Sequence, residues 1–196
     1  MIKGSTALPA AAVADPSVDR YLARQPIFDR QDSVLGYELL FRSGLDNFFK
    51  PQDASRPSEC HIDNFLLFGL ETLTCGRRAF INFTRNDLVR GLPTLFPRDR
   101  IVVEILESTL ADAEAISACR RLKQAGYLIA LDDFVLSPRS EPFLPFADVI
   151  KVDFRTTREH ERERLVRHLA PRGIKLLAEK VETHEDILAA REIGYA

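Results

Sequence analysis

Short apolar runs alternate with amphipathic helical stretches along most of this chain, and this alternation restricts its fold more than any other feature. Five apolar runs predict buried strands at residues 79–82, 101–106, 128–131, 149–152 and 174–178. Helical patterns predict helices at residues 112–125, 157–169 and 184–193. Nearly continuous apolar strands that alternate with helices are typical of a parallel sheet covered by helices. We therefore expect an α/β fold.

Two more strands are predicted before this region, at residues 21–28 and 34–41. The polar turn 29–32 joins them, which favours an antiparallel pair. A helical pattern follows from residue 62 to about residue 76. The chain then holds seven strands in 196 residues and stops where an eighth would begin, whereas a complete eight-stranded α/β barrel takes roughly 250 residues. We expect a barrel truncated before its eighth strand.

The ends and the composition of the chain set further limits. Residues 1–18 are rich in Ala and Pro and are expected to be a disordered leader to one domain at residues 19–196. The net charge of −2 and the pI near 6.1 give no general attraction to nucleic-acid polymers or anionic membranes. No apolar run approaches the roughly 18 residues that a membrane helix needs. Cys60, Cys75 and Cys119 form no CxxC pair, and we expect them to be small buried residues in a reducing cytosol.

Polar residues follow the apolar runs at the predicted strand ends. They are Asn82, Glu104, Asp132 with Asp133, Lys151 and Glu179. In a parallel barrel these ends meet on one rim, where the active site lies. Converging carboxylates repel one another, and Mg²⁺ or Mn²⁺ would neutralise them, activate a water molecule and balance the charge of a phosphate. A lone carboxylate after a strand is more often a helix cap or a solvated loop residue, and Lys151 alone could be an ordinary salt-bridge partner, but five strand ends together favour a metal site.

The same positions resemble the motifs of the EAL domain family of cyclic di-GMP phosphodiesterases. Gly-Tyr-Glu-Leu-Leu-Phe-Arg at 36–42 resembles the EAL signature, and Gln-Pro-Ile at 25–27 matches a pocket segment. Asn82, Val-Glu-Ile-Leu-Glu at 103–107, Asp-Asp-Phe at 132–134 and Ile-Lys-Val-Asp at 150–153 follow in the family order. Ala-Glu-Lys-Val-Glu-Thr at 178–183 has lysine where the family has glycine. The signature and this last variant resemble the branch whose EAL domain precedes an HDOD domain, which is absent here.

This resemblance implies a TIM-like (β/α) barrel that opens cyclic di-GMP to linear pGpG with two Mg²⁺ or Mn²⁺ ions. It assigns metal binding to Glu38, Asn82, Glu104, Asp132 and Asp133. It makes Glu179 part of the metal and water network, while Lys151 steadies the attacking water or the phosphate. Ligand contacts fall to Gln25, Pro26 and Arg42, and loop support to Glu107 and Glu182. A homodimer, or a domain joined to a regulatory partner, is also implied. We expect a cytoplasmic location from the lack of an apolar membrane segment, the unpaired cysteines and a nucleotide messenger as ligand.

One segment departs from the family pattern. Val-Leu-Ser-Pro-Arg-Ser-Glu-Pro at 135–142 stands where the family has a glycine-rich loop that secures the second metal. Proline restricts the backbone that glycine would free, so the sequence slightly favours a regulatory module that binds cyclic di-GMP or a partner. An active phosphodiesterase is the alternative. A third possibility, an aldolase-like Schiff base on Lys151, is disfavoured because neighbouring acids would keep the lysine protonated.

Overall fold

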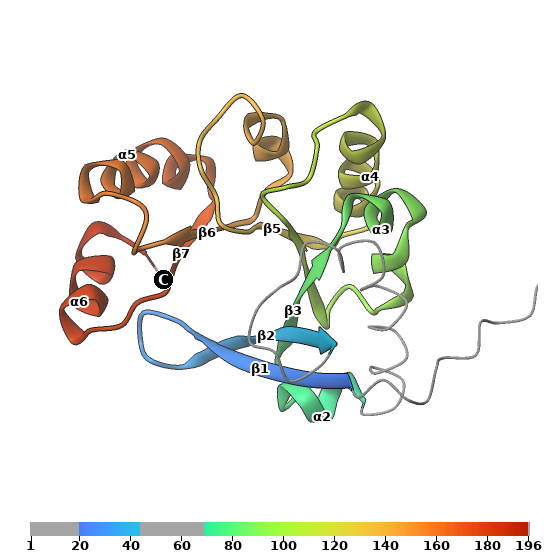
Figure 1. The fold of residues 1–196 in the computed structure, drawn as a ribbon, viewed down its shortest axis with the longest axis horizontal. Coiled ribbons are helices and arrows are strands. Elements are labelled where there is room, and N and C mark those ends of the chain that lie inside the picture. The colour runs from blue at the N-terminus through green and yellow to red at the C-terminus, as the bar shows by residue number, and fades with distance from the viewer. Residues whose placement is uncertain (1–19, 44–68, 196) are drawn as a thin grey trace, which may run out of the picture.

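The computed structural model of the protein describes residues 20–43 and 69–195, and the side chains of residues 22–40 and 69–195 (Figure 1). The predicted leader at 1–18, the first part of the helix predicted from residue 62, and Cys60 lie outside the described residues. The strands are β1 (Arg20–Phe28), β2 (Val34–Ser43), β3 (Arg78–Phe83), β4 (Ile101–Ile105), β5 (Leu128–Leu131), β6 (Val149–Asp153) and β7 (Lys175–Glu179). The α-helices are α2 (Leu70–Thr74), α3 (Arg85–Arg90), α4 (Ala113–Gln124), α5 (Glu159–Leu169) and α6 (His184–Ile193).

The seven strands form one sheet in the order β1-β2-β3-β4-β5-β6-β7. β1 pairs with β2 antiparallel, and every following pair is parallel, as the sequence predicted. The sheet curls into a half-barrel with α3, α4, α5 and α6 along its outer side (Figure 1). Within the described residues, β1 pairs only with β2 and β7 only with β6, so the sheet is open between them.

The two faces of the sheet bury different sets of residues. The face toward the helices packs against α4 and α5 through residues such as Ile81, Val103 and Ile150. The opposite face carries a second set, which we call the inner cluster: Phe80, Val102, Ala130, Val149 and Leu177. Successive side chains in a strand point to opposite faces, so a residue two positions further along returns to the same face. Two positions beyond the inner cluster stand Asn82, Glu104, Asp132, Lys151 and Glu179.

The helices begin and end on local signals in the sequence. Asp112 caps α4 by accepting a hydrogen bond from the Ala115 N–H, and a capping box between Thr183 and Asp186 starts α6. α4 and α6 agree with their predicted bounds, but α5 begins at Glu159, two residues later than predicted.

Short elements and one cysteine differ from the prediction. The sequence pattern did not predict α3 or the 3₁₀ turns η2 (Leu92–Leu95), η3 (Glu141–Phe146) and η4 (Ala170–Arg172). Segments this short show too little of the helical period to be recognised. Cys119 is buried, but Cys75 is exposed, because it follows the last residue of α2 rather than facing a core.

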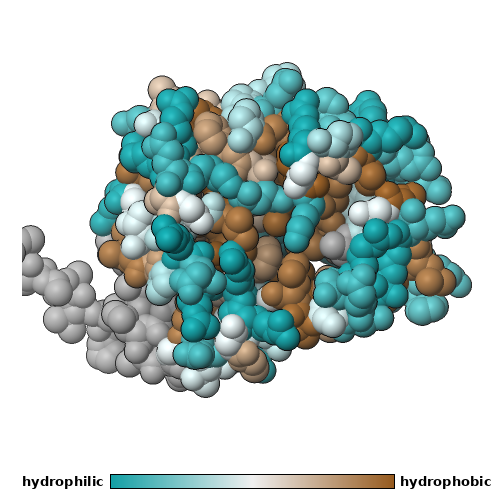
Figure 2. Space-filling model, turned by 180° about the vertical axis from the view of Figure 1, so that it is seen from behind, coloured by the Kyte–Doolittle hydropathy of each residue, from teal (hydrophilic) through white to brown (hydrophobic). Residues whose placement is uncertain are grey.

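The surface is mixed in character. Seen from behind, hydrophilic side chains cover much of the molecule, and hydrophobic residues show between them (Figure 2). Among the described helices, none combines the length and the apolar character needed to cross a bilayer.

Candidate active site

Lys151 on β6 is the centre of the predicted rim. Its ammonium nitrogen lies within 3.1 Å of four carboxylates that come from four other strands or strand ends. The distances are 3.1 Å to Glu38 Oε2, 2.8 Å to Glu104 Oε1, 2.7 Å to Asp132 Oδ1 and 2.8 Å to Glu179 Oε1. We call these five residues the Lys151 group. The structure therefore brings together residues that lie as far as 141 positions apart, from 38 to 179.

The Lys151 side chain is almost fully buried, with 2% of its surface exposed. Burial alone would lower the pKa of this lysine. Attraction to the four carboxylates outweighs burial, and the pKa is raised above its ordinary value. Because a Schiff-base nucleophile must be a neutral amine, the structure argues against the aldolase-like alternative.

The carboxylates of the group respond to the same crowding. Burial raises the pKa of Glu104 well above its usual range, and Glu38 and Asp132 add to this while Lys151 opposes it. Burial also raises the pKa of Glu179, to about 7. Asp132 and Glu38 add to this rise, and Lys151 opposes it. Four carboxylates face one ammonium, so the group has negative charge to spare and attracts a further cation.

Unpaired oxygen atoms also point to a cation. Asn82 Oδ1 and Glu104 Oε2 are buried and accept no hydrogen bond. Glu104 Oε1 contacts the Lys151 ammonium without hydrogen-bond geometry. Asn82 and Glu104 are paired in register on β3 and β4, so these atoms belong to neighbouring side chains on one face. Buried polar atoms without partners are rare and call for an explanation, and a hard oxygen-binding ion would supply one.

In the conformation seen here, the carboxylates close on Lys151. Among the described residues, no three or more acidic, histidine or cysteine side chains are arranged to hold an ion as they stand. The donor set itself, which consists of carboxylate and amide oxygens, fits Mg²⁺, Mn²⁺ or Ca²⁺. Small rotations away from the lysine would therefore have to accompany binding.

A second lysine holds the adjacent part of the rim. Lys180 Nζ donates to Asp133 Oδ1 at 3.0 Å and to Asp153 Oδ2 at 2.6 Å. The hydrogen bond to Asp153, together with the one to Asp133, raises the pKa of Lys180. Burial tends to raise the pKa of Asp153, but hydrogen bonds from Lys180 and two backbone N–H groups outweigh it, and the pKa is lowered. Neither Lys180 nor Asp153 was predicted to have a role in the site, although the lysine stands at a position where the family has glycine.

The remaining predicted residues lie on β1, on β2 and in the segments that follow β4 and β7. Gln25 is paired with Glu38 across β1 and β2, and it is exposed, as is Pro26. Arg42 belongs to β2, but its side chain lies outside the described part of the chain. Glu107 is exposed at the edge of a small pocket, and Glu182 forms an ion pair with Arg155 at 2.8 Å.

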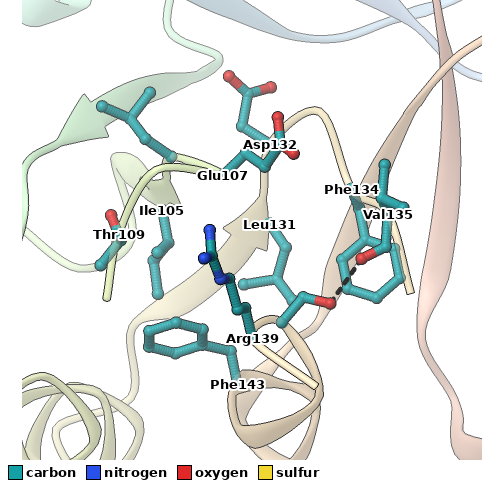
Figure 3. A pocket seen from close by; sticks show the side chains of 11 residues that line it. Ile105, Glu107, Thr109, Leu131, Asp132, Phe134, Val135, Arg139 and Phe143 are labelled. Carbon is teal, nitrogen blue, oxygen red and sulfur yellow. Dashed lines mark hydrogen bonds between the residues drawn. The ribbon is translucent and has the colours of Figure 1, made fainter. Parts of the chain in front are cut away.

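The divergent loop after β5 is braced by its own side chains. Ser140 Oγ donates to the Val135 carbonyl at 2.6 Å and accepts from the Ser137 N–H at 3.0 Å. η3 then anchors the loop because Phe143 and Leu144 are buried. In the pocket beneath, Arg139 lies between Phe143 and the acidic end that holds Asp132 (Figure 3).

The fold and the rim define a class: an α/β-barrel protein with a cation-attracting acidic group at the carboxyl ends of its strands. The chain belongs to the EAL domain family, whose model matches residues 76–196. It is 40% identical over 185 residues to the cyclic di-GMP phosphodiesterase CdgJ of Vibrio cholerae, covering 92% of this chain and 43% of CdgJ. It is 39% identical over 181 residues to the uncharacterized protein YuxH of Bacillus subtilis, covering 89% of this chain and 44% of YuxH. The chain thus spans less than half the length of these relatives.

Solved structures share the fold. The Bacillus subtilis YkuI protein, solved with cyclic di-GMP and calcium, matches with a TM-score of 0.71 and 23% identity over 90% of this chain and 53% of its own. The PaMucR phosphodiesterase in complex with cyclic di-GMP matches with a TM-score of 0.71 and 20% identity, covering 90% and 91% of the two chains. At these identities the likeness concerns the fold.

Proposed function

We propose that this chain is a divalent-metal-dependent phosphodiesterase domain that hydrolyses cyclic di-GMP to linear pGpG. The observation that carries the proposal is the Lys151 group, in which four carboxylates from separate strands converge beside the unpaired oxygens of Asn82 and Glu104. Similarity to CdgJ, a cyclic di-GMP phosphodiesterase, supports the choice of substrate.

Each residue of the rim has a task in this proposal. Glu38, Asn82, Glu104 and Asp132 would hold a Mg²⁺ or Mn²⁺ ion, which when bound lowers the pKa of a water molecule and offsets the charge of the phosphate. Glu179, whose pKa is raised to about 7, is suited to accept a proton near neutral pH. The Lys151 ammonium is fixed by its four contacts and would steady the developing negative charge. Gln25, Pro26 and Arg42 would contact the nucleotide.

Turnover of cyclic di-GMP tests this proposal. The protein is incubated with the nucleotide in Mg²⁺ and then in Mn²⁺, and linear pGpG is measured. We expect product from the wild type and a loss of at least about 100-fold in Glu38→Ala, since a ligand carboxylate is removed. Glu114→Gln is the matched control, because Glu114 is an exposed acid whose ion pair with Arg85 includes no residue of the rim. Equal rates in wild type and Glu38→Ala would contradict the proposal.

The braced loop favours a second candidate, a module that binds cyclic di-GMP without cleaving it. The hydrogen bonds of Ser140 and the burial of Phe143 hold this loop where the family has a glycine-rich one. A normal binding isotherm with no product in either metal would support this reading over hydrolysis. Ser140→Ala would loosen the loop, and product that appears only in that variant would show that the braced loop prevents hydrolysis.

We infer a cytoplasmic protein that forms a homodimer or is joined to a regulatory domain. The greater length of the two curated relatives is compatible with a further domain such as HDOD. Size-exclusion chromatography with light scattering measures the oligomeric state directly.

A further inference from the structure

We propose that the ammonium group of Lys180 acts as a built-in cation at the rim, holding Asp133 and Asp153 so that the site has one divalent-ion position there instead of two. This inference rests on the proposed function, because it concerns the same rim. It assigns a positioning role to Lys180 and an anchoring role to Asp153.

The contacts of Asp153 make it a fixed anchor for the lysine. Its Oδ1 accepts the N–H groups of Arg155 at 2.7 Å and Thr156 at 3.2 Å, while its Oδ2 accepts Lys180 Nζ at 2.6 Å. The residue is 8% exposed. Both oxygens are therefore occupied by donors of this chain, and the lysine is the one that carries a charge.

From this anchor, Lys180 reaches across to the strand end of β5. Its nitrogen lies 3.0 Å from Asp133 Oδ1, and Asp133 follows directly on Asp132, a member of the Lys151 group. An ammonium at that distance satisfies the carboxylate and repels another cation that would bind it. Asp132 and Asp133 therefore pair with different lysines: Asp132 with the buried Lys151, and Asp133 with the exposed Lys180.

The backbone at both residues is unusual. Lys180 has φ +54° and Asp133 has φ +42°, in the left-handed region that favours glycine. A lysine there costs conformational energy that glycine would not. The two charged contacts of Lys180 offset this cost. This indicates that a lysine occupies this position because of its side-chain contacts, since the backbone conformation would favour glycine.

Counting Mn²⁺ ions bound per chain tests the inference. Lys180→Gly removes the ammonium and relieves the backbone, while Lys180→Gln removes the charge and keeps a side chain of similar reach. Lys123→Gln is the matched control, because Lys123 also donates to a carboxylate, that of Asp148 at 2.6 Å, but Asp148 directly precedes β6 and so lies at the opposite end of that strand from Asp153. Equilibrium dialysis followed by elemental analysis gives the count, and circular dichroism checks that each variant is folded.

We expect both Lys180 variants to bind one Mn²⁺ more per chain than the wild type, and Lys123→Gln to bind the same number. Adding Asp133→Asn to Lys180→Gly should remove the extra ion. Equal counts in the wild type and both Lys180 variants would overturn the inference. The number of ions bound by the wild type tests the proposed function separately, because a wild type that binds no ion contradicts the proposed metal site. The inference about Lys180 depends only on the difference between the counts of the variants and of the wild type.

Discussion

At the scale of single residues, charge balance dominates the rim. Lys151 is buried with four carboxylates around it, and removing one partner of a buried ionic group leaves charge that nothing compensates. Lys123 is the contrasting case. It pairs with Asp148 at 2.6 Å with both side chains roughly 30% exposed, where water screens the interaction.

Lys151→Met is therefore expected to lower the free energy of unfolding by about 3–5 kcal/mol in metal-free protein. Lys123→Met should lower it by about 1 kcal/mol or less. Urea denaturation measures both. Adding Mn²⁺ should recover part of the loss in Lys151→Met, since the ion replaces the missing positive charge. Similar losses in the two variants would show that the Lys151 group is not a buried charge cluster.

The cysteines offer a pH-dependent test at the same scale. Burial raises the pKa of the Cys119 thiol to about 11, so roughly 0.1% of it is thiolate at pH 8, and this fraction rises as the pH rises. Cys75 is exposed. In a Cys60→Ser background, iodoacetamide at pH 8 should label Cys75 and leave Cys119 unmodified until the protein unfolds, as measured by mass spectrometry of peptides. Rapid labelling of Cys119 in folded protein would contradict its burial.

At the scale of elements, strand register places the rim on the inner cluster. Each polar residue stands two positions beyond an apolar one, so the cluster forms the floor of the site. Gly36 on β2 leaves room for the ring of Phe80, which is part of that floor. A Cβ added there would lie 2.7 Å from the Arg78 carbonyl and 2.8 Å from the Phe80 ring.

We expect Gly36→Ala to destabilise the protein by about 1–3 kcal/mol, because neither the β3 backbone nor the packed ring can move freely. Thermal denaturation measures the loss. Adding Phe80→Leu should recover only part of it, since the contact with the Arg78 carbonyl persists. Unchanged stability in Gly36→Ala would mean that β2 and β3 are less closely paired than their register implies.

At the scale of the whole molecule, the rim connects strands from both ends of the described chain. Glu38 comes from β2 and Glu179 from β7, and both contact Lys151. An ion bound there would hold the curl of the half-barrel together, and a ligand that binds only the folded state raises its stability.

Mn²⁺ at about 100 times its dissociation constant should stabilise the protein by about 2.7 kcal/mol. For a domain of this size this corresponds to a rise in Tm of roughly 5–10 °C. Glu104→Gln should abolish most of that rise, while Glu114→Gln should leave it unchanged. Differential scanning fluorimetry with and without Mn²⁺ gives the comparison, and an equal rise in both variants would place the ion elsewhere.

The sequence by itself determined the seven strands, the antiparallel first pair, and the meeting of Asn82, Glu104, Asp132, Lys151 and Glu179 on one rim. It could do so because strand periodicity is a local property, and because short right-handed crossovers usually place consecutive parallel strands side by side, with their carboxyl ends on one rim. The tertiary structure alone decided how charge is shared there. Lys151 gathers four carboxylates, and Lys180 bridges Asp133 and Asp153, which lie 47 and 27 residues away. Such contacts depend on how far the sheet curls and where each long side chain can reach, and no local pattern encodes either.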